Sequence, residues 1–444
     1  MPDAPAFEPR SPFETAFRTA IEGADAYRAV RAGLRLHDDI LRIGNRFVSA
    51  DRFREIAFVA LGNAAGAMAL AAQEMLGERL TQGLTAGAVP PPDVLQFQSM
   101  AVPDAWPGSS GATAALASVL ELVGDLHEED LLLLLLSPGA FSITAGPPTG
   151  WDPGRWRDLL QQVASRSGPV NAVRVARVLG TGAVGGRLGA AAREPLVVTL
   201  VVDRGEGPEW VGGGPTVPLR PEEPSVAKNL VSDTRFMDSP RDPSVLVGRN
   251  VQRPVVVTGP ADAVEAAGNL LAGQGWISRM VSLHLPGSPD EVASQFVQGM
   301  ETIRREQVAE PRRLATDAEE RESEVALPSI PMPTTATPAA RPESRGLAVF
   351  ASATFNTVEG GERTDEVRAF LRAVSRQSVR REAYVGALRT AGEISGRGGG
   401  AGNWLGRRVG ADPSAEPVIE TFAVRAGFTD VGTLLVGFVP WVAR

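Results

Sequence analysis

The sequence predicts an α/β protein with a doubly wound, mostly parallel sheet and a second, smaller α/β unit at the C-terminal end. Three short runs of consecutive apolar residues have the length of strands buried on both faces, and they cover residues 56–61, 131–136 and 196–202. Segments rich in alanine and leucine, with helical spacing, separate these runs. Strands that alternate with helices in this way are typical of a Rossmann-like domain.

The remaining elements follow from the same two periodicities. Predicted helices cover residues 12–36, 64–77, 110–122, 156–165, 261–271, 289–307, 364–375 and 380–390. Further predicted strands cover residues 254–258, 276–285, 347–351 and 433–439.

Composition shifts divide the chain into four parts. Residues 1–240 form the predicted N-terminal α/β domain, and residues 241–309 continue it with strand and helix units. Residues 310–345 are first highly charged and then rich in proline, threonine and alanine, which predicts a linker. Residues 346–444 form the predicted smaller C-terminal domain.

Composition also excludes several classes of function. The 444 residues carry a formal net charge of −8 and show no basic patch with interleaved aromatics, so we expect no nucleic-acid partner. The chain has no cysteine, and its three histidines lack the spacing of metal ligands. The longest apolar run is far shorter than the roughly 20 residues of a membrane helix, and no signal peptide is recognisable, so we expect a cytoplasmic protein with no membrane partner. Its alanine- and leucine-rich faces make a homodimer an expected assembly.

The turn after the first predicted strand is the strongest functional signal. Gly62 and Asn63 follow the apolar run 56–61, and a helix of small residues begins directly afterwards. A strand that enters a helix through a glycine turn presents backbone N–H groups and the positive end of the helix dipole, and such turns bind anions. The turn therefore predicts an anion site.

Several further segments recur in a fixed order along most of the chain. They are Gly62-Asn63-Ala64-Ala65, Val102-Pro103-Asp104, Ser137-Pro138-Gly139-Ala140-Phe141-Ser142, Asn171-Ala172-Val173-Arg174, Gly185-Gly186-Arg187-Leu188, Asp203, Gly214-Pro215-Thr216 and residues 426–433. In this order the segments resemble the glycerate 2-kinases of the MOFRL type. The resemblance implies a Rossmann-like domain, a C-terminal MOFRL-like domain, and transfer of the ATP γ-phosphoryl group to the 2-hydroxyl of glycerate between them.

The resemblance also implies roles for individual residues. Catalytic positions would be Asn63, which stands where the family has lysine, together with Arg174 and Arg187. Asp203 would hold Mg²⁺. Phosphate-binding positions would be Gly62, Ser137, Gly139, Gly185, Gly186, Gly214 and Thr216. An active enzyme would use ATP and Mg²⁺ with a small hydroxy acid.

This sequence departs from the family pattern in ways that weaken phosphoryl transfer. Asn63 carries no charge, and Lys228 is the only lysine in the chain. Pro138 has no N–H to donate, and Phe141 adds bulk in the expected phosphate loop. Near the C-terminal domain the proline-rich residues 328–342 replace expected glycine-rich segments, and the expected Gly-Thr-Asp-Gly loop appears only as residues 353–356, without its acidic residue.

The candidate residues also have structural interpretations. Asp203 would equally serve to cap the turn after its strand. Arg174 and Arg187 would form either a bidentate anion clamp or surface salt bridges. Gly185 and Gly186 would either approach a ligand or simply form a turn.

Two hypotheses follow, and a third is disfavoured. The first is a glycerate 2-kinase-fold protein with a degenerated active site and a binding, regulatory or structural role. The alternative is an active ATP-dependent glycerate 2-kinase that uses arginine where the family uses lysine. A dinucleotide-dependent enzyme is disfavoured, because the first turn lacks Gly-x-Gly-x-x-Gly and no histidine-based acid or base is apparent.

Overall fold

The computed structural model describes residues 10–88, 93–103, 105–231, 250–324, 345–355, 364–377, 383–389, 401–408, 418–423 and 433–440. The α-helices are α1 (Arg10–Gly23), α2 (Ala26–Gly33), α3 (Ala65–Leu76), α4 (Ser110–Gly124), α5 (Phe141–Thr144), α6 (Pro153–Ser167), α7 (Pro169–Leu179), α8 (Arg187–Ala191), α9 (Glu223–Leu230), α10 (Pro260–Gly273), α11 (Pro289–Glu324) and α12 (Thr364–Arg376). Short 3-10 helices are η1 (Ala50–Arg52), η2 (Gly77–Arg79) and η3 (Val211–Gly213).

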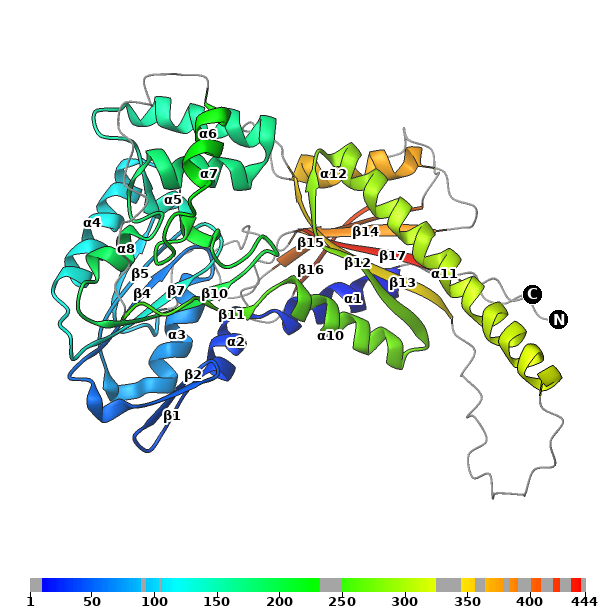
Figure 1. The fold of residues 1–444 in the computed structure, drawn as a ribbon, viewed down its shortest axis with the longest axis horizontal. Helices are drawn as coiled ribbons and strands as arrows, with labels where there is room; N and C mark the ends of the chain where they lie inside the picture. The colour runs from blue at the N-terminus through cyan, green and yellow to red at the C-terminus, as the bar shows by residue number, and fades with distance from the viewer. Residues whose placement is uncertain are drawn as a thin grey trace.

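The strands assemble into two large sheets that lie side by side and two small ones (Figure 1). Those of the first large sheet are β4 (Ile56–Leu61), β5 (Leu80–Gly87), β6 (Gln98–Ala101), β7 (Leu131–Leu136), β10 (Leu196–Val202) and β11 (Val255–Thr258). Those of the second are β12 (Trp276–Gly287), β13 (Gly346–Phe355), β14 (Tyr384–Arg389), β15 (Ala401–Arg408), β16 (Val418–Ala423) and β17 (Thr433–Pro440). The small sheets contain β1 (Leu34–His37), β2 (Ile40–Ile43) and β3 (Arg46–Ser49), and β8 (Ala145–Gly146) with β9 (Thr181–Gly182).

The first large sheet confirms the predicted doubly wound fold. Within the described residues its strand order is β6-β5-β4-β7-β10-β11, and every neighbouring pair is parallel. This order corresponds to the Rossmann order 3-2-1-4-5-6. The first strand of this sheet in sequence, β4, lies in its middle. The chain continues through β5 to the edge strand β6 and then returns to β7, beside β4. The switch point, where such folds bind ligands, therefore lies between the carboxyl ends of β4 and β7.

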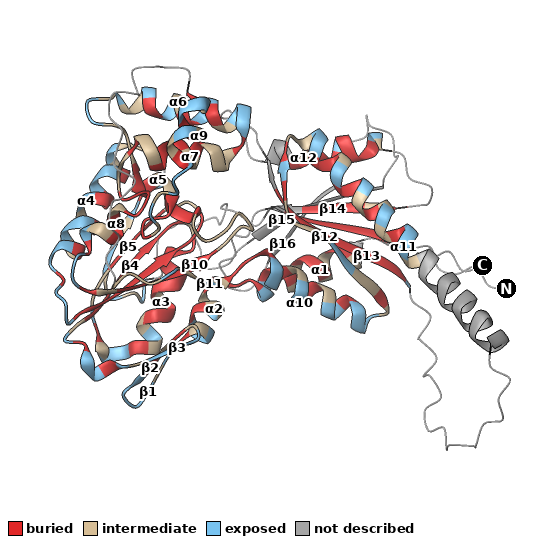
Figure 2. Ribbon diagram, viewed as in Figure 1, coloured by how far each residue is buried: buried red, intermediate tan, exposed pale blue. Residues whose placement is uncertain are grey.

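The central strands are apolar throughout because both of their faces are covered. All six residues of β7 are buried, as are all six of β4. Alternate leucines of β7 enter two different cores: Leu133 packs in the core with Met68 of α3, and Leu134 packs in the core with Val119 of α4. Helices thus cover both faces of the sheet, and the burial view shows its central strands β4, β7 and β10 buried, whereas the edge strands β6 and β11 are mostly half-buried or exposed (Figure 2).

The second large sheet is mixed. Its order in the described part of the chain is β12-β13-β17-β14-β15-β16, and only the β12–β13 pair is parallel. Helices α11 and α12 cover one face through a core that includes Phe296 and Phe370. On the other face, the ring of Phe438 meets those of Phe13 and Trp276 edge-on, each with centroids 4.8 Å apart.

The structure corrects three predicted elements. The helix predicted over 12–36 is divided at Asp25, whose side chain accepts a hydrogen bond from the N–H of Arg28 and so starts α2, and the chain enters β1 at Leu34. The helix predicted over 380–390 is wrong, because β14 occupies this stretch between β15 and β17. Helix α11 continues to Glu324, so the first part of the segment predicted as a linker, 310–345, is helical.

Two predicted segments lie largely outside the described residues. They are the proline-rich residues 328–342, and residues 426–433 of the family resemblance, of which only Thr433 is described. Asp104 and Asn356 also lie outside this part.

The N-terminal helix connects the two sheet-centred units. Helix α1 packs along α10 and contacts β15 and β17 of the second sheet, although it precedes every strand of the first. Conversely, β11, which lies in the segment 241–309, completes the first sheet. The chain therefore passes between the units twice, near Gly23 and near Gly259. One continuous core runs from Phe58 in the first sheet to Phe438 in the second.

We predict that Gly23→Ala destabilises the protein by about 1–3 kcal/mol, the usual cost of overpacking. A Cβ at this position would lie 2.3 Å from the Cβ of Ala266 and 3.0 Å from the carbonyl oxygen of Asp262 on α10. Urea denaturation measures the change in the free energy of unfolding. Adding Ala266→Gly to the Gly23→Ala variant should recover part of the loss. Unchanged stability of the single variant would contradict this account of how α1 is held.

Candidate functional site

Four predicted residues meet at the switch point. Gly62 and Asn63 follow β4, and Ser137 and Gly139 follow β7, the adjacent parallel strand. The N–H of Ser137 donates to the carbonyl of Leu61 over 2.9 Å, and the N–H of Asn63 donates to the carbonyl of Pro138 over 2.8 Å. The two loops are therefore hydrogen-bonded to each other along their backbones.

The hydroxyl of Ser137 closes the start of α3. This side chain is fully buried, accepts a hydrogen bond from the N–H of Ala64 over 3.0 Å, and donates to the carbonyl of Leu61 over 3.2 Å. An N–H at the beginning of a helix usually seeks a capping oxygen or a bound anion. Here a protein side chain supplies that oxygen.

Both glycines of these loops are in close contact with their neighbours. A Cβ on Gly62, whose φ is +112°, would lie 2.3 Å from the carbonyl oxygen of Ser137. A Cβ on Gly139, whose φ is +92°, would lie 2.6 Å from Oδ1 of Asn63. The side chain at the family lysine position thus lies against the opposite loop.

A second set of predicted residues meets beside α7. Gly185 and Gly186 donate their N–H groups to the carbonyls of Gly213 and Gly214, both over 2.9 Å. The hydroxyl of Thr216 lies 3.0 Å from that of Thr199 on β10, and both are buried. The two glycine segments are thus paired along their backbones.

The two sets of loops are in contact with each other. Thr144 Oγ1 donates to the carbonyl of Gly212 over 2.7 Å. A Cβ on Gly213 would lie 3.3 Å from Cδ2 of Phe141, the bulky residue of the expected phosphate loop. Around α5 the loops after β7 and β10 therefore form one packed layer (Figure 1).

Most of the predicted phosphate-binding N–H groups donate to protein carbonyls. This holds for five of the seven predicted residues: Gly62 to Ala86, Ser137 to Leu61, Gly185 to Gly213, Gly186 to Gly214, and Gly214 to Val211. An N–H that already donates within the protein must lose that bond before it can bind a phosphate oxygen.

The two predicted arginines also bind within the protein. Arg174 donates from Nη1 to the side chain of Asn171 over 2.9 Å, and its guanidinium lies 5.0 Å from the ring of Trp210. Arg187 donates from Nη1 to the carbonyl of Val184 over 2.6 Å and from Nη2 to that of Arg177 over 3.0 Å.

Arg177 is the residue of this region that the sequence analysis missed. It is fully buried on α7 and forms a two-point ion pair with Glu223 of α9, over 2.7 and 2.9 Å. Its other N–H groups donate to the carbonyls of Glu209, Gly213 and Pro218. The sequence signal for Arg177 is its position three residues after Arg174 on one helix, because residues three apart lie on the same face and would be brought to the same region.

Asp203 follows β10, and its hydrogen bonds stabilise the turn that comes after this strand. Its N–H donates to the carbonyl of Thr258 over 3.0 Å, and its Oδ1 accepts from the N–H of Gly207 over 3.2 Å. Burial raises the pKa of its carboxyl, although hydrogen bonds from the backbone of Gly207, Arg204 and Gly205 partly oppose that rise. In the described part of the chain, no group of three or more acidic or histidine residues is placed to hold a metal ion.

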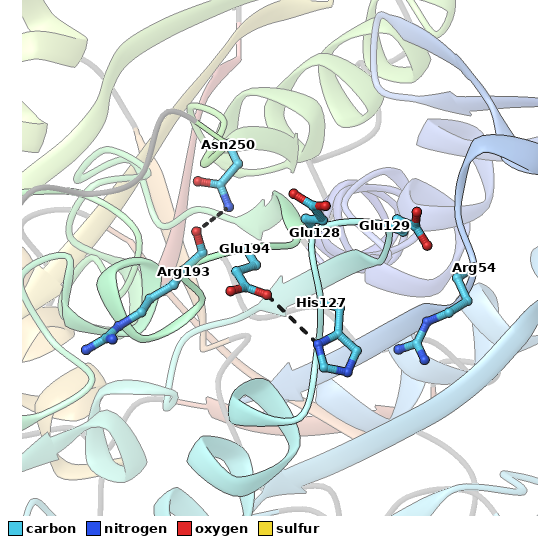
Figure 3. A pocket seen from close by; sticks show the side chains of 7 residues that line it. All are labelled: Arg54, His127, Glu128, Glu129, Arg193, Glu194 and Asn250. Atoms are coloured by element: carbon cyan, nitrogen blue, oxygen red, sulfur yellow. Dashed lines mark hydrogen bonds and ion pairs between the residues drawn. The ribbon is translucent and has the colours of Figure 1, made fainter.

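A surface depression lies at the other end of the sheet. Its volume is about 860 Å³, and it lies where the loops enter β4, β7, β10 and β11 (Figure 3). It is lined by Arg54, His127, Glu128, Glu129, Arg193, Glu194 and Asn250. Ligands of doubly wound sheets bind at the carboxyl ends of the strands, so we do not assign the functional site to this depression.

Comparison with known proteins identifies the family. Residues 13–242, about half of the chain, match the family described as "Domain of unknown function (DUF4147)". The chain belongs to the DUF4147 family. It is 26% identical over 192 residues to a protein of Agrobacterium vitis named "Putative hydroxypyruvate reductase", and 24% identical over 224 residues to a "Glycerate kinase" of Danio rerio. These matches cover 41% and 45% of this chain, and 50% and 43% of the two relatives, so the chain spans about half the length of the curated relatives it matches.

Two solved structures share the fold of this DUF4147 protein. The PH0495 protein of Pyrococcus horikoshii OT3 matches with a TM-score of 0.58 and 16% identity over 99% of this chain and 100% of that one. The glycerate kinase of Thermotoga maritima matches with a TM-score of 0.58 and 17% identity over 96% and 97% of the two chains. The family and the fold are therefore glycerate kinase-like, as the sequence resemblance predicts. No described helix has the length and apolar character needed to cross a membrane.

We predict that Ser137→Ala lowers the free energy of unfolding by about 1–3 kcal/mol, because it leaves the buried N–H of Ala64 without its acceptor. Chemical denaturation measures the loss. Ser142→Ala, at a half-buried position of the same loop, is the matched control and should cost less. Equal losses in the two variants would show that the capping hydroxyl does not stabilise the switch point.

The raised pKa of Asp203 predicts a pH dependence. The ordinary pKa of this carboxyl is 3.8, and it is higher in the folded state than in the unfolded state. The folded state therefore binds the proton more tightly, and it loses stability as the pH rises above 3.8. Relative to Asp203→Asn, the wild-type protein should therefore lose stability over the pH range that begins near 3.8 and ends at the raised pKa of the folded state. Denaturation curves of both proteins across this range test the trend, with Asp158→Asn on α6 as the exposed control. A relative gain in wild-type stability would contradict the assigned direction.

Proposed function

We propose that this protein keeps a glycerate kinase-like fold but has lost efficient phosphoryl transfer, and that it acts through binding, regulation or structure. The observation that carries the proposal is the internal use of the backbone donors: five of seven predicted phosphate-binding N–H groups donate to protein carbonyls.

Phosphoryl transfer makes demands that this site meets poorly. Catalysis rests on positioned donors and cations that neutralise charge on the transferred group. Asn63 supplies no charge at the family lysine position. Loss of one strong transition-state contact typically costs about 2.7–4 kcal/mol of barrier.

The available cations do not compensate for that loss. Arg187 donates to two backbone carbonyls, and Arg174 is held by Asn171 and Trp210. To reach a phosphate, either side chain would have to exchange these contacts. Reorganisation of this kind weakens electrostatic stabilisation of a transition state.

A working kinase is the second candidate. It would be ATP- and Mg²⁺-dependent and would phosphorylate a small hydroxy acid, with Asp203 as the metal ligand. The position of the loops supports it, since Gly62 and Ser137 lie at the switch point of a doubly wound sheet. The name "Glycerate kinase" of the relative from Danio rerio favours the same activity. For either function we propose a cytoplasmic location.

Titration calorimetry with Mg-ATP and Mg-ADP, followed by an ADP-release assay with D-glycerate, tests the proposal. We expect no turnover, and we expect Asn63→Lys not to restore it, because the N–H groups of residues 63 and 64 still donate within the protein. An NADH-consumption assay with hydroxypyruvate tests the reaction suggested by the name of the Agrobacterium vitis relative.

Each outcome decides between roles. Turnover that falls in Asp203→Asn would overturn the proposal and support the kinase. Nucleotide binding without turnover would indicate a nucleotide-responsive regulator. Absence of binding at about millimolar nucleotide, where binding free energies are only about 4 kcal/mol, would indicate a structural or partner-binding role.

A further inference from the structure

The small antiparallel sheet β1-β2-β3 has one buried and one exposed face. On the buried face, Leu34, Leu41 and Ile43 are at most 1% exposed. The opposite face, here called the outer face, has two rows that cross the strands: Arg35, Arg42 and Phe47 form one, and His37, Ile40 and Ser49 form the other. Arg42 is half-buried and the other five are exposed. The sheet lies at the margin of the first unit (Figures 1 and 2).

Two guanidinium groups are neighbours on this face. Arg35 lies directly opposite Arg42, so their Cβ atoms are about 4.5–5.5 Å apart. Like charges in this arrangement destabilise an antiparallel pair. Arg42 donates from Nε to the uncharged carbonyl of Gly44, and among the described residues no carboxylate forms an ion pair with either arginine. The pair is therefore a local excess of positive charge in a chain whose net charge is −8.

An apolar pair adjoins the two arginines. Phe47 is 69% exposed and lies directly opposite Arg42, whereas Ile40 is 49% exposed and lies two residues from Arg42 on the same strand. Phe47 and Ile40 are thus diagonal neighbours on adjacent strands, about 7–8 Å apart. The charged pair and the apolar pair adjoin at Arg42. A ligand that fits this face combines negative charge with a large apolar group.

The protruding end of the small sheet limits the kind of ligand. Asp38 and Asp39 form the turn between β1 and β2, and both are exposed. The carboxylate of Asp38 lies 3.8 Å from Nε2 of His37, so it is placed beside the second row and not beside the arginines. A nucleic acid or an anionic membrane would extend over these carboxylates and be repelled by them. A short anionic segment confined to the first row would avoid them.

We propose that the outer face of β1-β2-β3 binds a short acidic segment of another protein, with two adjacent carboxylates followed by a large apolar side chain. The carboxylates pair with Arg35 and Arg42, since a guanidinium offers two parallel N–H donors to a carboxylate. The apolar side chain covers Phe47 and Ile40. This contact is separate from the switch point and does not depend on whether phosphoryl transfer survives there.

The size of the surface fits a peptide better than a folded domain. Three strands of four residues present roughly 200 Å² of sheet, whereas a stable interface between two folded proteins buries about 800 Å² per partner. Exposed ion pairs each contribute little to the binding free energy and are screened by salt. We therefore expect weak binding, with a Kd of about 0.1–1 mM at low salt.

Fluorescence anisotropy of labelled peptides, titrated with the full chain up to about 1 mM, tests the proposal. A peptide with the central sequence Glu-Glu-Leu-Leu should bind, and the matched peptide with Gln-Gln-Leu-Leu should bind at least about fivefold more weakly. Raising the salt from about 20 to 500 mM should remove most of this difference.

Single substitutions locate the contact. Arg35→Ala, Arg42→Ala and Phe47→Ser should each weaken binding of the acidic peptide at least about threefold without changing the thermal unfolding midpoint. Arg166→Ala is the matched control, because it removes the same charge from an exposed position of α6 and should leave binding unchanged.

A charge exchange separates recognition from a structural role of the arginines. The double variant Arg35→Glu with Arg42→Glu should lose the acidic peptide and gain a peptide with Lys-Lys-Leu-Leu. Absence of binding of the acidic peptide, equal affinity for its glutamine form, an equal loss in Arg166→Ala, or no gain in the double variant would overturn the proposal. Tighter binding of oligo-deoxythymidylate, weakened by the same substitutions, would also overturn it, because the partner would then be a nucleic acid.

Discussion

Two parallel strands that end side by side leave backbone groups that the sheet no longer pairs, and a buried group of this kind must find another partner. At the ends of β4 and β7 that partner is the protein itself. Ser137 bonds Leu61 through its N–H and its hydroxyl, and the same hydroxyl accepts from Ala64. The positions of α3, of the loop after β7 and of α5 all follow from this small network. The N–H groups that such a site usually presents to a ligand therefore already donate to acceptors of the protein.

The second constraint is the buried charge of Arg177. A buried guanidinium is tolerated only when it is paired and its hydrogen bonds are satisfied. Glu223 and three backbone carbonyls meet that need, and in doing so they fix α7, α9 and the glycine segment after β10. The carbonyls of Gly213 and Gly214 are then in place to accept from Gly185 and Gly186. Opening these loops would expose the ion pair as well as break backbone bonds.

The sequence could predict what depends on local patterns. The strands 56–61, 131–136 and 196–202 were found because both of their faces are buried, which leaves an uninterrupted apolar run. The sequence did not predict β14, because Gly386 and Ala387 interrupt the alternation of apolar and polar residues that marks a strand. Its partners β15 and β17 also lie later in the chain, so the pairing is not a local signal. The Arg177–Glu223 pair joins residues 46 positions apart, so only the fold brings them together. The candidate loops, by contrast, could be predicted, because the turn at Gly62 follows a buried strand and enters a helix, and the loop at Ser137 belongs to the family resemblance.

Internal satisfaction of the loops also limits how a ligand could act on this protein. A ligand shifts a conformational equilibrium only by the difference in its affinity for the two states. Here an anion would first have to displace carbonyl acceptors at Gly62, Gly185 and Gly186, and its binding energy would be spent on that exchange. The net affinity of the switch point for an anion is lowered by the cost of breaking these internal hydrogen bonds.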